Sequence, residues 1–191
     1  MRKIKNFKIN IRTREISRII RKLLNVEDLP IEVEECVQKA CFVCEKVIKP
    51  AVVYDTFSKE TMVFSIEIEA PEKWVAMSAY VLTIGTVLEE EYNKNKELFG
   101  EYGVQIISAI SADALDQSRN FVQKLLSSEA GDENCELSRN IEIPKQYNQE
   151  IIKSLPVDKI NLSLTEEGDF VPANSMAGIY YWIPLKKKSR K

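Results

Sequence analysis

The order in which helical and strand-like hydrophobic patterns follow one another restricts the fold of this chain more than any other feature. Residues 13–25 and 31–48 repeat apolar side chains at the helical spacing of three and four. We expect Thr13 to cap the first of these helices. Residues 51–57 and 62–68 have the short apolar or alternating pattern of strands joined by a turn. Two helices therefore precede a hairpin instead of lying between its strands.

The rest of the chain continues this mixture without a regular strand–helix–strand repeat. We expect strands over 78–84, 159–164 and 175–183, helices over 86–99, 102–126 and 144–155, and a loop over 127–134. Small residues are frequent in the helix over 102–126, which lets a neighbouring element approach closely. This order predicts an α+β fold, a single domain with a mixed or antiparallel sheet and flanking helices.

The chain of 191 residues contains no histidine, which excludes several kinds of active site. Ser-His and Cys-His nucleophile pairs need an imidazole, and so do His-ligated zinc and haem sites. The chain also cannot supply a His ligand to cobalt. Proton transfer would fall to Asp, Glu, Lys, Tyr or Cys. We assign no catalytic residue and no metal ligand from the sequence.

Cysteine usage and the N-terminus indicate a reduced, cytoplasmic protein. Cys36, Cys41, Cys44 and Cys135 are too few for a disulfide framework at this length. We expect them to pack as small apolar residues, and a zinc or iron–sulfur site of four thiolates is the alternative. The charged N-terminus does not resemble a signal peptide, and no apolar run reaches the ~18 residues of a membrane span.

Charge is distributed unevenly along the chain. Residues 1–22 carry nine Lys or Arg and a single acid, and residues 186–191 carry five basic residues, although the net charge of the chain is −2. Basic ends can bind nucleic acid or an acidic partner. We expect them instead to be solvated ends on an acidic body.

Two short polar patterns each admit a chemical and a simpler interpretation. Residues 83–86 join a strand to a helix, where backbone amides can hold an anion, and we favour a plain turn. Asp113 and Asp116 lie three residues apart on one helix and could form an acid–base pair or hold a metal. We expect a solvated helix face there.

The segment 164–182 combines a polar turn with a strand that ends in three consecutive aromatic residues. Because side chains alternate along a strand, Tyr180 and Trp182 share one face and Tyr181 takes the other. Such aromatics can line a pocket for a planar or cationic ligand, or they can simply pack within a sheet.

This segment resembles the signature of the activation domain of cobalamin-dependent methionine synthase, especially in its free-standing bacterial relatives. The matching residues, in order, are Leu164, Thr165, Glu166, Pro172, Ser175, Gly178, Tyr180 and Tyr181. The family order also includes Thr83-Ile84-Gly85, the small-residue helix over 108–116, and Arg139 followed by Pro144. The resemblance covers residues 75–183, which would form the activation-domain-like core. Residues 1–70 would add N-terminal helices and a hairpin to the same domain, and residues 184–191 a basic tail.

The resemblance implies a function in the reductive reactivation and methylation of cobalamin. Domains of this family bind S-adenosylmethionine and cap the cobalamin domain of the synthase, so the reacting cobalt belongs to another domain. The chain would then be at most a component of a methyltransferase. Its expected partner is a corrinoid-binding protein or a methionine synthase subunit that carries the cobalamin, with no membrane and no nucleic acid involved.

The resemblance also implies which residues hold S-adenosylmethionine. Arg139 matches an Arg that contacts the ligand carboxylate, which suits a bidentate guanidinium. Tyr180 and Tyr181 match an aromatic pair that contacts the same ligand, and Glu166 is assigned to this site. The loop from Arg139 to Pro144 lacks the Pro-Gly-Tyr turn of the family. The alternative is therefore a non-catalytic binding module on the same fold that has lost S-adenosylmethionine binding.

Overall fold

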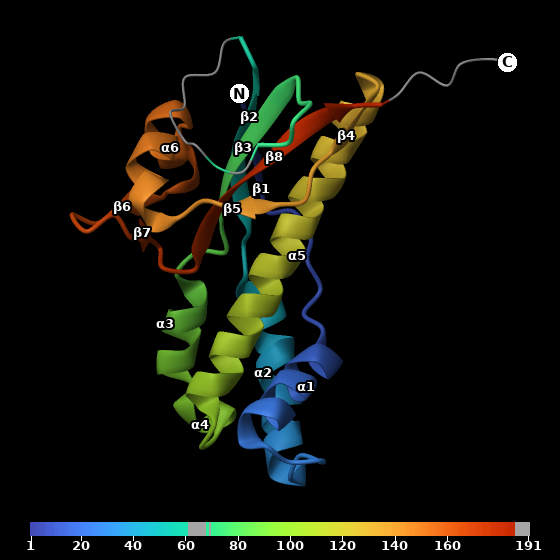
Figure 1. Cartoon of the computed structure of the whole chain (residues 1–191). Helices are drawn as coiled ribbons and strands as arrows, with labels where there is room; N and C mark the ends of the chain where they lie inside the picture. The colour runs from blue at the N-terminus through green and yellow to red at the C-terminus, as the bar shows by residue number, and fades with distance from the viewer. Residues whose placement is uncertain (61–67, 69, 186–191) are drawn as a thin grey trace, which may run out of the picture.

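An antiparallel sheet occupies one end of the molecule, and a group of helices extends from it (Figure 1). The computed structural model describes residues 1–60, 68 and 70–185, so most of the predicted strand over 62–68 lies outside the described residues. The strands are, in order across the sheet, β1 (Arg2–Lys5), β2 (Ala51–Ser58), β3 (Ala76–Thr83), β8 (Ser175–Pro184) and β4 (Cys135–Leu137), and β5 (Ile141–Glu142) also pairs with β8. Each pairing between these strands is antiparallel, which confirms the predicted α+β class.

The two N-terminal helices lie where the periodicity predicts them. Helices α1 (Thr13–Leu24) and α2 (Ile31–Val47) bury their apolar faces in one core with the first half of α5. The predicted Thr13 cap is wrong, because Thr13 is the first helical residue and no side chain caps this end of α1. Arg12 precedes the helix instead, and its backbone carbonyl accepts the first helical hydrogen bonds from Glu15 and Ile16.

The middle of the chain forms three helices. The predicted helix over 86–99 is interrupted at Asn95 and consists of α3 (Val87–Lys94) and α4 (Lys96–Phe99). Helix α5 (Gly103–Asp132) has 30 residues and runs from the helical end of the molecule across one face of the sheet (Figure 1). It continues through most of the segment 127–134 that is predicted as a loop. The reason is that Leu126 and Ala130 lie one helical turn apart and are both fully buried on the face of α5 that packs on the sheet.

The opposite face of the sheet is covered by α6 (Asn148–Ser154) and by two 3₁₀ turns, η1 (Lys145–Tyr147) and η2 (Val157–Ile160). The predicted helix over 144–155 thus corresponds to η1 and α6. The predicted strand over 159–164 is mostly wrong, because Val157 and Ile160 bury their side chains from the tight turn η2.

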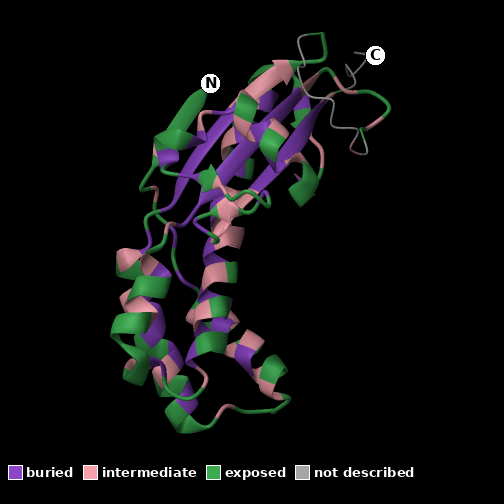
Figure 2. Ribbon diagram, turned by 90° about the vertical axis from the view of Figure 1, so that its left-hand side faces the viewer, coloured by how far each residue is buried: buried purple, intermediate pink, exposed green. Residues whose placement is uncertain are grey.

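A small hairpin completes this side of the sheet. Only Ser163–Leu164 of the predicted strand is extended; it forms β6 and pairs with β7 (Phe170–Val171). The strands β2, β3 and β8 form the buried centre of the sheet (Figure 2). Along β8, Tyr180 packs toward α5, and Tyr181 packs toward α6, as strand alternation predicts. No helix in the described ranges has both the length and the apolar character of a membrane span.

Candidate functional site

The edge strand that follows α5 contains a bulge, and the bulge brings two of the predicted site residues together. Cys135–Leu137 pairs with Pro184–Trp182 in one register, whereas Ile141 and Glu142 pair with Ile179 and Gly178 in a register shifted by one residue. Arg139 and Asn140 therefore both lie opposite Tyr180. Bulges of this kind redirect side chains and are frequent beside functional sites. Arg139 is exposed at the bulge.

The bulge carries a polar cluster on its α5 side. The Tyr80 hydroxyl donates to Asn140 Oδ1 at 2.8 Å, and its ring stacks on Tyr180 with centroids 5.9 Å apart. On α5, Arg119 pairs with Asp116 and lies 3.7 Å from Glu142 of β5. These contacts join α5, β3 and β5 around the aromatic pair of β3 and β8.

Tyr180 itself is fully buried, and its hydroxyl has no hydrogen-bond partner among the described residues. Burial raises the pKa of Tyr180 to about 12, with Arg119 opposing the shift, so the phenol is neutral at physiological pH. Gly178 allows Tyr80 to approach, because an added Cβ would lie 2.5 Å from the Tyr80 hydroxyl oxygen. This contact gives a physical reason for a glycine at this position.

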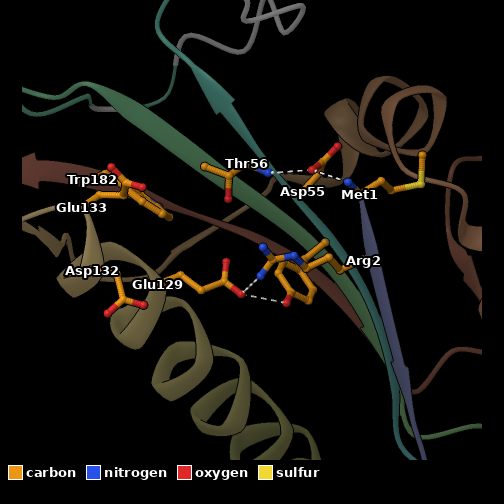
Figure 3. Close-up of a pocket in the computed structure, with 9 residues that line it drawn as sticks. Met1, Arg2, Asp55, Thr56, Glu129, Asp132, Glu133 and Trp182 are labelled. Carbon is orange, nitrogen blue, oxygen red and sulfur yellow. Dashed lines mark hydrogen bonds and ion pairs between the residues drawn. The ribbon is translucent and has the colours of Figure 1, made fainter.

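A cavity of about 360 Å³ lies elsewhere, between the β1–β2 edge and the end of α5 (Figure 3). There Arg2 and the Tyr54 hydroxyl both bond Glu129 of α5, the latter at 3.0 Å. These contacts hold the edge strand against α5, which is a structural role.

The α6 side of the same bulged edge holds a cavity of about 350 Å³. Its lining combines apolar side chains with charged groups at the mouth, among them Ile143, Phe170, Met176, Glu142, Lys145 and Asp169. Lys145 and Asp169 form an ion pair at 2.7 Å that joins η1 to the β6–β7 turn. Both segments singled out from the sequence, the one after Arg139 and the one after Leu164, thus border one cavity.

The structure separates the remaining predicted site residues. Tyr181 is 2% exposed and faces α6, where its ring packs on Trp74 and its hydroxyl donates to the Ile68 carbonyl at 3.1 Å. Glu166 is exposed in the turn between β6 and β7. Neither tyrosine of the pair contributes to the cavity lining. The structure therefore places Arg139 beside Tyr180 and leaves Tyr181 and Glu166 apart from them.

Three residues at this edge were not found from the sequence. Arg119 could have been suspected, because it lies three residues after Asp116 on the same helix. Glu142 and Asn148 gave no signal, since their partners come from other elements. Asn148 is 5% exposed and donates to the Gly168 carbonyl at 3.0 Å, while its Oδ1 has no partner among the described residues.

The expectation of a solvated face for Asp113 and Asp116 is wrong for Asp113, which is 3% exposed. Its carboxylate accepts hydrogen bonds from the Arg12 backbone at 3.0 Å, from the Arg12 guanidinium at 2.7 Å and from the Gln117 amide at 2.8 Å. We call these three residues the Asp113 cluster. It attaches the segment before α1 to α5 and has a structural role.

The cysteines pack largely as expected. Cys41, Cys44 and Cys135 are buried, and Cys135 lies beside Trp182 in a different core cluster from the other two. Burial raises the pKa of Cys41 to about 11 and of Cys44 to about 12. Over residues 1–60, 68 and 70–185, no group of three or more Cys, His, Asp or Glu side chains could hold a metal ion.

The turn over 83–86 also has the simpler structure. β3 ends at Thr83 and α3 begins at Val87. The Gly85 backbone donates to the Thr83 hydroxyl at 3.1 Å, and Gly85 adopts a positive φ of 82°. A strand-to-helix turn accounts for these residues.

Comparison with known proteins supports the fold. No protein-family model matches the chain, and no curated protein matches it. The chain is similar to a solved structure described as the MetH reactivation domain bound to AdoHcy, with a TM-score of 0.63 and 14% sequence identity. The match covers 98% of this chain and 80% of that chain. The molecule therefore has the α+β fold of a methionine synthase reactivation domain, as the sequence resemblance predicts.

Proposed function

We propose that this protein binds an S-adenosyl compound, S-adenosylmethionine or its demethylated product, at the bulged β5–β8 edge. The observation that carries the proposal is the cavity bordered by both segments that resemble the activation-domain family. The fold similarity supports it, since the solved structure was obtained with AdoHcy bound. A cavity of about 350 Å³ lies within the range of small-molecule sites, ~300–1,000 Å³.

The residues at this edge suit the charged, amino-acid part of such a ligand. Arg139 is exposed at the bulge and can bind the amino-acid carboxylate through its planar guanidinium. Glu142 lines the cavity and provides a carboxylate near which a sulfonium or ammonium group would be favoured. When bound, S-adenosylmethionine would supply the methyl group, and the residues of this chain would hold and orient it.

The partner in this proposal is a corrinoid protein. Since the chain has no histidine, it cannot provide an imidazole ligand to cobalt, and the cobalamin would be carried by the partner. The protein would then act as an accessory subunit that brings S-adenosylmethionine to reduced cobalamin. Size-exclusion chromatography with a purified, cobalamin-loaded domain of a methionine synthase tests this part, and co-elution is the expected result.

Isothermal titration of the full chain with AdoHcy tests ligand binding. We expect Arg139→Gln to weaken AdoHcy binding by about tenfold or more, because a charge-assisted hydrogen bond contributes ~1.5–3 kcal/mol. Arg14→Gln is the matched control, since Arg14 is also exposed but lies on α1. Equal effects of the two substitutions, or no binding of AdoHcy to the unmodified chain, would contradict the proposal.

The burial of both tyrosines on opposite faces of the sheet favours a second candidate. In that case the protein is a binding module that keeps the fold and a protein partner but has lost S-adenosylmethionine binding. Co-elution with the cobalamin-loaded domain without any heat of AdoHcy binding would identify this function.

A further inference from the structure

Nearly all polar side chains that line the cavity on the α6 side are already paired. Lys145 bonds Asp169, and Glu142 lies within ion-pair distance of Arg119. Ser175 Oγ lies 2.8 Å from the Thr83 hydroxyl and 2.6 Å from the Pro172 carbonyl. Among the described lining residues, the buried side-chain atom left without a partner is Asn148 Oδ1.

Asn148 is held in place by its other amide atom. Its Nδ2 donates to the Gly168 carbonyl at 3.0 Å, which fixes the amide orientation and leaves Oδ1 as an acceptor. The residue is 5% exposed, and Oδ1 has no donor among the described residues. A buried acceptor without a donor is unfavourable, and a bound donor would remove that penalty.

The rest of the lining indicates what kind of donor fits. Ile143, Ala173, Met176 and Ala177 provide apolar surface, and the half-buried ring of Phe170 lies at the same wall. A flat and mostly apolar group with an N–H donor at its edge matches this composition. Asn148 Oδ1 has almost no exposed surface, so a ligand donor would reach it by a small local shift at this wall that leaves the bond from Asn148 to Gly168 in place.

We infer that this cavity takes a 6-aminopurine ring and that Asn148 Oδ1 accepts a hydrogen bond from its exocyclic amine. The inference rests on the proposed function for the choice of an adenine-containing ligand, and it adds the residue that selects the base. A 6-oxopurine would place a carbonyl oxygen against the Asn148 oxygen, so two acceptors would face each other. Asn148 would therefore distinguish adenosine from inosine.

The test compares adenosine and inosine, which differ at this position of the purine, by isothermal titration against the full chain. We expect adenosine to bind at least about tenfold more tightly, from the penalty for an unpaired buried acceptor. In Asn148→Leu the preference should disappear. Asn148→Asp is the matched variant: both substitutions remove the bond to Gly168, but the aspartate keeps an acceptor and should keep the preference.

Several results would overturn the inference: equal binding of the two nucleosides to the unmodified chain, binding of neither, or loss of the preference to the same extent in both variants. The comparison on the unmodified chain decides the matter even where a variant does not fold. AdoHcy separates this inference from the proposed function. Binding of AdoHcy without nucleoside preference refutes the role of Asn148 alone, whereas nucleoside preference without AdoHcy binding refutes the proposed function alone.

Discussion

The Asp113 cluster and the bulged β5–β8 edge both bury polar side chains, but they complete their hydrogen bonding differently. The Asp113 carboxylate receives bonds from Arg12 and Gln117, and no atom of it is left unpaired. At the bulged edge, Asn148 Oδ1 and the Tyr180 hydroxyl are buried and have no partner in the part of the chain that the structure describes. Buried polar atoms that serve only to stabilise a fold need all of their hydrogen bonds to be made within the protein. Under the proposed function, the unpaired oxygen of Asn148 is the one that another molecule would use, because Asn148 lines the cavity and Tyr180 does not.

The largest effect should come from breaking the fully paired region. Asp113→Ala leaves the Arg12 backbone amide and the Arg12 Nε without their acceptor, and we expect a loss of about 2–3 kcal/mol in the free energy of unfolding. Urea denaturation monitored by circular dichroism measures it. Asp116→Ala is the control and should lose about 1 kcal/mol or less, because its carboxylate is one-third exposed. Equal losses of unfolding free energy in the two variants would show that the Asp113 carboxylate stabilises the fold no more than the partly exposed Asp116 carboxylate does.

Packing at the bulged edge should be nearly as sensitive. In Gly178→Ala the new methyl group would collide with the Tyr80 hydroxyl, and we expect a loss of about 2 kcal/mol in unfolding free energy. Gly131→Ala is the control, since nothing lies within 4 Å of an added Cβ there. It lies in the last turn of α5 and should be neutral or slightly stabilising. Equal stability of Gly178→Ala and the unmodified chain would contradict the close packing described for Tyr80.

The two tyrosines of this edge permit a direct comparison of a paired and an unpaired hydroxyl. Tyr80→Phe removes the donor to Asn140 Oδ1, and we expect about 1 kcal/mol of destabilisation. Tyr180→Phe removes a hydroxyl that has no partner within residues 1–60, 68 and 70–185, and it should leave stability unchanged or raise it slightly. Thermal unfolding of the two variants side by side measures the difference. If Tyr180→Phe is the more destabilising of the two, the Tyr180 hydroxyl is not unpaired in solution.

The smallest effect concerns the helical end and appears with rising pH. Burial raises the pKa of Cys41 from 9.0 to about 11 and of Cys44 from 9.0 to about 12. The unfolded chain therefore releases these protons first, so their contribution to stability is complete well below pH 9 and decreases as pH rises toward 11. At pH 9 the expected loss is ~0.4 kcal/mol for each thiol. In the double variant Cys41→Ala/Cys44→Ala, the free energy of unfolding measured by urea denaturation should decrease less between pH 7 and pH 9 than in the unmodified chain. Equal decreases in the two proteins would contradict the raised pKa values of these thiols.

Periodicity was sufficient for the long elements and insufficient wherever a distant partner decides the structure. The apolar spacing around Ile16 and Val37 predicts α1 and α2 to within one residue at their ends. The end of α5 was missed because the burial of Ala130 depends on the sheet, not on the polar residues around it. Asp113 was misplaced for a similar reason, since its partner Arg12 lies 101 residues away.

The candidate site was less predictable than the fold. Strand alternation correctly separates Tyr180 from Tyr181, but it cannot show that both rings are buried. The bulge at Arg139 depends on the register of two strands against β8, which no local pattern contains. Asn148 begins a short helix and has no distinguishing neighbour in the sequence. The β6–β7 turn supplies the Gly168 carbonyl that binds the other amide atom of Asn148, so the unpaired oxygen can be identified only in the folded structure.

The length of α5 has a consequence for how the molecule unfolds. Ile106, Ile110 and Ala114 belong to the core of the helical end, while Val122 and Leu126 belong to the core under the sheet. At ~1.5 Å per residue the helix spans ~45 Å, so one continuous element completes both cores. Leu115 of this helix and Phe7 pack against both cores, so the cores share side chains as well as one helix. We therefore expect the two ends of the molecule to unfold as one cooperative unit, and a protein partner that stabilises one end to stabilise the other.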